Sequence, residues 1–183
     1  KVRSAREANR LAAIAMLLAA FGVLLDFQGT NDISVSAWIW IICGTLIGGL
    51  LGTITAKKVP MTAMPEVVAL FNGCGGMSSL LVALGVALFP FSEAAGGDMN
   101  PFVQSLSIVI SLFVGAITFS GSIVAMAKLQ GWLSTPSWTQ SKIRHLFNIF
   151  CAVLSLIAGI SILMNGQNGI TLLLVSSFLL GIG

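Results

Sequence analysis

A few polar side chains stand inside long apolar stretches of the sequence, where a proton or a water molecule is the natural ligand. Asn72 lies in the stretch 64–89, and Thr118, Ser120 and Ser122 lie in the later half of the stretch 102–129. If these stretches cross a membrane, each such group is costly unless it meets a partner or water. Two interpretations stay open: the groups hold helices together, or they line a hydrated path.

Two ionisable residues flank these stretches. Glu66 follows Pro65 in the first turn of the stretch that starts at residue 64. A helix N-terminus favours a carboxylate, so Glu66 either stabilises this end or accepts protons at the mouth of a path. His145, the only histidine, precedes the stretch 146–164 beside basic residues, which is typical of a residue flanking a helix. We do not expect it to be the central proton carrier.

Covalent chemistry is not expected from this chain. Within the apolar stretches we find no Ser-His-Asp set, carboxylate pair or metal-ligand cluster. Cys43, Cys74 and Cys151 lie singly, without CxxC spacing, and are interpreted as packing residues. The segment Asn72–Gly76 lacks the glycine and lysine pattern of a phosphate loop, so its glycines predict close helix packing or a flexible helix. We predict no catalytic, cofactor-binding or metal-binding residue here.

The composition indicates a lipid environment. Hydrophobic residues make up 56% of the 183 residues and charged residues 8%, whereas a soluble domain carries about 25% charged residues. Lipid offers the backbone no hydrogen bonds, so membrane spans of about 20 residues are helical. The net charge of +3 is small, so nucleic-acid binding is not expected.

Six apolar stretches predict an all-α fold, a polytopic transmembrane helix bundle. They cover residues 9–25, 33–56, 64–89, 102–129, 146–164 and 169–183. The first five have about 17–28 residues, enough to cross a bilayer with some tilt. The sixth would measure roughly 22 Å, too short to cross, so we expect its span to be truncated and residues 1–183 to be a fragment of a transmembrane domain. Gly44, Gly48 and Gly52 form overlapping GxxxG patterns that predict helix packing.

The basic residues indicate how the bundle is oriented. With six spans, all nine Lys and Arg residues fall on one face: Lys1, Arg3, Arg6, Arg10, Lys57, Lys58, Lys128, Lys142 and Arg144. The opposite face carries Asp26, Asp32, Glu93 and Asp98. By the positive-inside rule, the basic face is cytoplasmic, or faces the matrix in a mitochondrion.

Two segments resemble a known family. Ala56–Leu70 (AKKVPMTAMPEVVAL) and Gly115–Leu129 (GAITFSGSIVAMAKL) are similar to the membrane domain of the beta subunit of proton-translocating NAD(P) transhydrogenase. Arg144 and His145, followed by Asn148, are also similar to that family. The resemblance runs from the first apolar stretch to the sixth.

The resemblance implies an enzyme that couples hydride transfer from NADH to NADP+ to inward proton movement. NAD(H) and NADP(H) would bind soluble domains that this chain lacks. The implied partners are the lipid bilayer, the alpha subunit with its transmembrane helices and NAD domain, the C-terminal NADP domain of the same subunit, and a second complete unit in a homodimer. We expect a bacterial inner membrane, with a mitochondrial one as the alternative.

The resemblance also implies a role for Asn72. In this family the corresponding residue is commonly His or Asn and belongs to the proton path. Asn does not titrate, whereas a His would do so near neutral pH; some members with Asn carry a His on a partner helix instead. The expected path comprises Asn72, Thr118, Ser120 and Ser122, with Glu66 near its inner mouth. The alternative is a different polytopic transporter or a structural membrane subunit.

Overall fold

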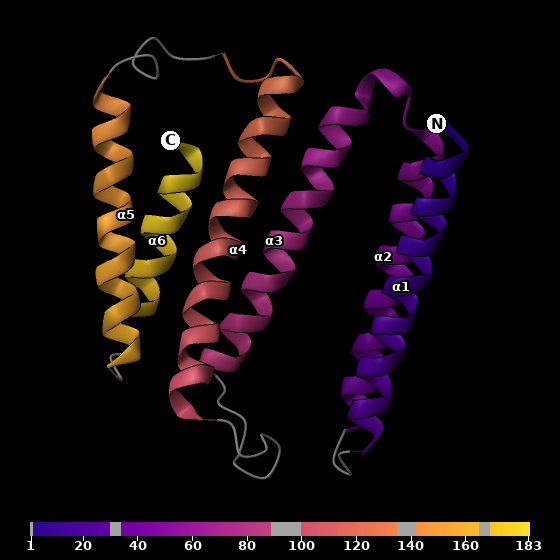
Figure 1. Cartoon of the computed structure of the whole chain (residues 1–183), viewed down its shortest axis with the longest axis horizontal. Helices are drawn as coiled ribbons and strands as arrows, with labels where there is room; N and C mark the ends of the chain where they lie inside the picture. Colours follow the sequence, from indigo (N-terminus) through magenta and orange to yellow (C-terminus); the bar gives the residue numbers. More distant parts are fainter. Residues whose placement is uncertain (1, 30–33, 89–99, 135–141, 165–168) are drawn as a thin grey trace. The chain divides into compact units, whose positions relative to one another are not determined.

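The structure is a computed structural model that describes residues 2–29, 34–88, 100–134, 142–164 and 169–183 (Figure 1). All regular elements in these ranges are helical, which confirms the predicted all-α class. They are α1 (Val2–Gly29), α2 (Val35–Lys58), a short 3-10 turn η1 (Met61–Ala63), α3 (Met64–Leu88), α4 (Pro101–Leu129), α5 (Lys142–Leu163) and α6 (Gly169–Ile182).

Five of the described helices are long and apolar enough to cross a membrane. α6 has 14 residues and measures about 21 Å, which agrees with the prediction of a short sixth helix. The predicted α5 start is wrong by four residues. Arg144 and His145 lie inside its first turn and not before it, because a helix continues through the interface, where polar side chains reach water.

Residues 1–58 form one compact unit and residues 59–183 another. In the first unit, no described side chain of α1 or α2 is fully buried. A Cβ added at Gly44, Gly48 or Gly52 would meet nothing within 4 Å. No described residue of this unit packs against these glycines, so the packing role predicted for them stays a prediction.

The helices of the second unit pack in the order α3, α4, α6, α5, and each runs opposite to the one before it in sequence, so that the neighbours α4 and α6 are parallel (Figure 1). α4 packs along α3 on one side and along α6 on the other, and α6 packs against α5. The core is made of small and aliphatic side chains, with Leu112, Ala158 and Leu173 almost fully buried. Phe119 of α4 meets Phe178 of α6 edge-on, with ring centroids 6.0 Å apart.

Local sequence signals define both ends of α4, the central helix. Asn100 caps its start, where its side chain accepts a 2.9 Å hydrogen bond from the backbone N–H of Phe102, and Pro101 occupies the first turn. Gly131 follows its end with a φ of 73°, a left-handed conformation that glycine adopts without strain. These local signals determine where α4 begins and ends.

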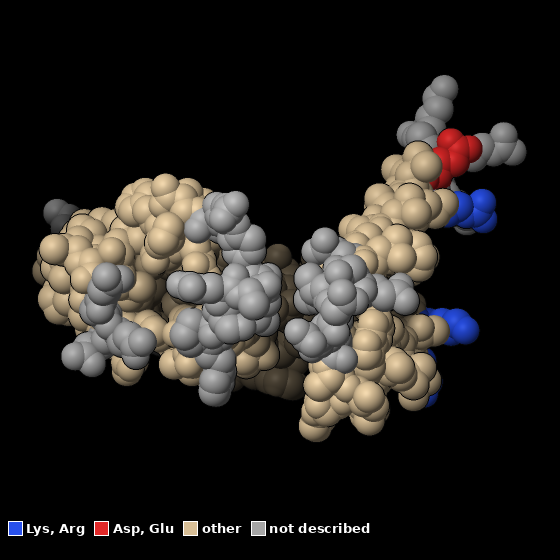
Figure 2. Space-filling view, turned by 90° about the horizontal axis from the view of Figure 1, so that it is seen from below, with Lys and Arg blue, Asp and Glu red and all other residues tan. Residues whose placement is uncertain are grey.

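The charged side chains that the structure describes in residues 59–183 lie at one end of the bundle. The antiparallel order brings the start of α3 with Glu66, the end of α4 with Lys128 and the start of α5 with Arg144 to the same end. In Figure 2, most of the described surface in view is uncharged, and the Lys, Arg, Asp and Glu side chains that it shows lie at the right-hand side. Lys1, Asp32, Glu93 and Asp98, which the predicted orientation also uses, lie outside the described residues.

Candidate functional site

Glycines bring α3 and α4 into direct backbone contact. A Cβ at Gly76 would stand 2.8 Å from the amide nitrogen of Phe119 and 2.8 Å from the Cβ of Thr118. A Cβ at Gly115 would stand 2.8 Å from the carbonyl oxygen of Gly76, and one at Gly73 3.2 Å from the Cβ of Ser122. α3 runs unbroken through this cluster, so the packing interpretation is confirmed for Gly73 and Gly76.

This close approach places Asn72 beside Ser122. The Nδ2 of Asn72 donates a 2.9 Å hydrogen bond to the Oγ of Ser122, fifty residues along the chain. Ser122 is buried, whereas Asn72 is exposed in the isolated chain. The hydroxyl accepts from Asn72 and keeps its own hydrogen to donate further. The carboxamide oxygen of Asn72 adds an acceptor at the same place.

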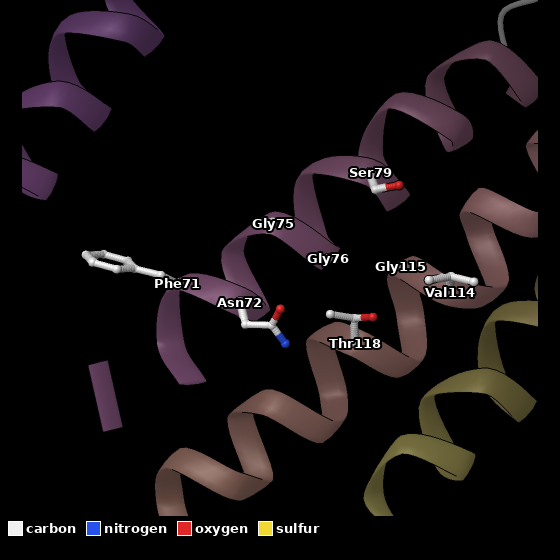
Figure 3. A pocket seen from close by; sticks show the side chains of 8 residues that line it. All are labelled: Phe71, Asn72, Gly75, Gly76, Ser79, Val114, Gly115 and Thr118. Carbon is white, nitrogen blue, oxygen red and sulfur yellow. The ribbon is translucent and has the colours of Figure 1, made fainter. Parts of the chain in front are cut away.

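An open hollow of about 350 Å³ adjoins this pair. It is lined by Phe71, Asn72, Gly75, Gly76 and Ser79 of α3 and by Val114, Gly115 and Thr118 of α4. Figure 3 shows Asn72 and Thr118 pointing into the space between the two helices, while Phe71 extends away from α4. The hollow is large enough for several water molecules and offers them carboxamide and hydroxyl partners.

Ser120 lies on the other side of α4. Its Oγ donates a 2.8 Å hydrogen bond to the carbonyl oxygen of Ala116, one turn earlier on the same helix. A Cβ added at Gly181 of α6 would collide with this hydroxyl. The structure therefore brings Asn72, Thr118 and Ser122 together and places Ser120 at the α4–α6 contact.

Glu66 lies near the end of the bundle, partly buried in the first turn of α3. It precedes Gly73 by two helical turns on the same side of the helix, and Gly73 contacts Ser122. Glu66 is thus about 9 Å along the helix from Asn72, on the side that faces α4. Lys128, at the end of α4, is exposed, as expected for a lysine that reaches toward the interface.

A second polar cluster, which was not predicted from the sequence, lies between α5 and α6. Ser155, Ser176 and Ser177 are all buried, and the hydroxyls of Ser155 and Ser176 lie 2.8 Å apart. Cys151, one turn before Ser155, is also buried, whereas Cys43 and Cys74 are exposed. The spacing of Arg144, Asn148, Cys151 and Ser155, which repeats every three or four residues, is the signal that could have revealed this face.

The site between α3 and α4 offers hydrogen-bond donors and acceptors only. Among the described residues, no three His, Cys, Asp or Glu side chains lie close enough to hold a metal ion. Asn72 and Ser122 can orient water and take part in a chain of hydrogen bonds. Neither an amide nor a hydroxyl gains or loses a net proton near neutral pH as histidine does.

Comparisons with known proteins agree with the resemblance carried by the two sequence segments. The family described as "NAD(P) transhydrogenase beta subunit" matches residues 1–183. Two sequences from Rhodospirillum rubrum, both named "NAD(P) transhydrogenase subunit beta", are 43% identical to the chain over 134 residues. That match covers 72% of this chain and 27% of each relative, so the aligned part spans about a quarter of their length.

Proposed function

The chain belongs to the family of NAD(P) transhydrogenase beta subunits, and from this premise we propose that it is the proton-conducting membrane part of such an enzyme. In this proposal, inward proton movement through the bundle is coupled to hydride transfer from NADH to NADP+. The transfer takes place on soluble domains outside residues 1–183. The chain itself binds neither nucleotide.

The observation that carries the proposal is the hydrogen bond from Asn72 to Ser122 beside an open hollow whose mostly apolar lining includes the polar side chains of Asn72, Ser79 and Thr118. Helix packing alone needs the glycine contacts but no hollow next to them. Water in the hollow donates to the carboxamide oxygen of Asn72 and accepts from Ser122 or Thr118. The three side chains thus hold a short chain of water in the apolar interior.

Asn72 orients the proton path but does not carry charge in it. We propose that the titrating group is contributed by a partner helix that faces the hollow, as the resemblance implies. Glu66 stands nearer the end of the bundle and collects protons at the inner mouth. Ser120 contributes to the path indirectly, because it packs α4 against Gly181.

The proposed orientation in the membrane is based on the uneven distribution of basic residues. The basic residues near Lys57, Lys128 and Arg144 would lie on the cytoplasmic side of a bacterial inner membrane. The proposed partners are the alpha-subunit helices and NAD domain, the C-terminal NADP domain of the same subunit, and a second complete unit. We propose that residues 1–183 are a transmembrane fragment of that assembly.

The test replaces Asn72 by Leu in the full enzyme reconstituted in sealed vesicles. Proton movement is followed with a pH-sensitive dye while hydride transfer is followed by absorbance. We expect proton-coupled turnover to fall at least about tenfold, since a buried Ser122 loses its partner and the hollow loses its carboxamide. Val82→Ala, an exposed position on the same helix, is the control. Unchanged coupled turnover in Asn72→Leu would reject the path.

A further inference from the structure

The end of α4 and the turn after it present a cation beside large apolar side chains. Lys128, in the last turn of the helix, is exposed. Leu129, Trp132 and Leu133 follow it and are 54%, 72% and 47% exposed. The surroundings of this end of the helix must therefore accept an aromatic ring and a positive charge from residues that lie close together in the sequence.

Backbone hydrogen bonds hold the turn after α4 against the helix. The N–H of Gly131 donates a 3.1 Å hydrogen bond to the carbonyl oxygen of Lys128, and the N–H of Trp132 donates a 2.9 Å bond to that of Ala127. Gly131, with its φ of 73°, lets the chain turn back at this point. The backbone of Trp132 therefore lies beside the last turn of α4, which keeps Trp132 and Lys128 neighbours in space.

The length of α4 places this end among lipid headgroups. Its 29 residues measure about 43 Å along the helix axis. The hydrocarbon core of a bilayer is about 30 Å thick, and the headgroup layers extend this to about 40–45 Å. A helix of this length centred in the core therefore reaches about 6–7 Å beyond it at each end. That depth corresponds to the last turn, which holds Lys128, and to the turn that carries Trp132.

We propose that Lys128 and Trp132 form a binding site for the headgroup of an anionic phospholipid. The ammonium group of Lys128 pairs with the lipid phosphate. The indole ring of Trp132 lies at the level of the headgroups, where a ring with one apolar and one polar side is most favourable. Leu129 and Leu133 contact the upper part of the acyl chains. An anionic lipid is preferred over a zwitterionic one because its net negative charge attracts the lysine.

The combination of lysine and tryptophan favours lipid over a protein partner at this place. Lysine is depleted at protein–protein interfaces, whereas Lys and Trp side chains anchor helices at the membrane–water interface. The connection from α2 to α3 shows a similar combination, because Lys57 and Lys58 are exposed and Met61 is 85% exposed. Two connections that follow basic helix ends thus pair cations with apolar side chains, as contact with charged headgroups and their acyl chains requires.

The lipid site does not depend on the proposed proton conduction. It concerns the end of α4, whereas the site at Asn72 is built on the hydrogen bond to Ser122 in the middle of the α3–α4 contact. A measurement of lipid contact in the resting enzyme, without any turnover, therefore tests this inference separately from the proposed function.

Trp132 is a native fluorescent probe of the site, because bromine atoms on a lipid chain quench an indole ring only at close contact. The full enzyme is reconstituted in vesicles made of equal parts of phosphatidylcholine and phosphatidylglycerol. In one preparation only the anionic phosphatidylglycerol carries bromine, in the part of its acyl chains nearest the headgroup. In the other preparation only the phosphatidylcholine carries it. The signal of Trp132 is the difference in fluorescence between the parent and Trp132→Phe.

We expect brominated phosphatidylglycerol to quench Trp132 more than brominated phosphatidylcholine, with a selectivity of about fivefold, the factor for one cation at an anionic membrane surface. Lys128→Gln should abolish this selectivity, and Lys128→Arg, which keeps the charge, should retain it. Trp40 is the matched control ring, because it is 77% exposed and lies in the stretch 11–56, which contains no Lys or Arg. Its signal, measured with Trp40→Phe, should not distinguish the two lipids.

Several results would overturn the proposal. If aqueous iodide quenches Trp132 and neither lipid does, the ring faces water; if none of the three quenches it, the ring is covered by protein. Equal quenching by the two lipids would mean lipid contact without an anionic site. A selectivity that persists in Lys128→Gln would remove Lys128 from the site. If that variant does not assemble, the comparison of the two lipids in the parent and in Lys128→Arg decides.

Discussion

Gly76 of α3 lies directly against Phe119 of α4, so that a side chain at position 76 would begin 2.8 Å from the amide nitrogen of Phe119. The neighbouring atoms are backbone and the Cβ of Thr118, and neither can move without the whole of α4. We expect Gly76→Ala to destabilise the bundle by about 1–3 kcal/mol, as overpacking does. The midpoint of thermal unfolding in detergent measures this.

The chain supplies a matched control one residue away. A Cβ at Gly75 would meet nothing within 4 Å, so Gly75→Ala should leave the unfolding midpoint unchanged or raise it slightly, since Ala favours helix. Equal losses in the two variants would mean that α3 and α4 do not meet at Gly76.

Ser122 and Ser120 are expected to respond differently to the loss of their hydroxyls. Ser122→Ala removes the acceptor of the Asn72 carboxamide, and proton-coupled turnover should fall by about two- to tenfold, the range that corresponds to one hydrogen bond. Ser120→Ala removes only a bond to the carbonyl of the same helix and should change turnover by less. Coupled proton uptake in vesicles compares the two. A larger effect at Ser120 would contradict the geometry.

Gly181 of α6 is expected to be intolerant of a side chain because Ser120 occupies the space. A Cβ there would collide with the Ser120 hydroxyl and stand 2.8 Å from the carbonyl oxygen of Ile117. Gly181→Ala should therefore lower stability by about 1–3 kcal/mol. Adding Ser120→Ala should restore part of this loss, because the nearest atom is removed, and the two changes should couple by at least about 0.5 kcal/mol. Purely additive thermal shifts would argue against the contact.

The number and extent of the helices could be predicted because lipid allows few alternatives. A stretch such as 102–129 must satisfy its own backbone, so apolar length alone predicts α4 within one residue of its start. The start of α5 was missed because Arg144 and His145 do not look like part of a span. The helix extends to them because both can reach water from its first turn.

The faces of the helices were harder to predict than their ends. Thr118 and Ser122 share a face by their spacing of four, and the structure places both toward α3. Ser120 was grouped with them by proximity in the sequence, although two residues turn a helix by about 200°. The contact between Gly76 and Gly115 depends on how two helices dock, which the local sequence does not encode.

Neutralising Glu66 distinguishes two possible roles of its carboxylate, because one role predicts a loss of stability and the other predicts slower proton uptake. If its carboxylate stabilises only the N-terminus of α3, Glu66→Gln should lower stability by about 0.3–1 kcal/mol and leave proton uptake unchanged. If it collects protons at the mouth of the path, uptake should slow severalfold at the same stability. We expect the second outcome, since Glu66 lies on the side of α3 that leads to Gly73 and Ser122. Glu7→Gln, an exposed carboxylate on α1, is the control, because it removes the same charge from a helix that does not contribute to the α3–α4 site. Equal slowing in both variants would assign the effect to net charge and remove Glu66 from the path.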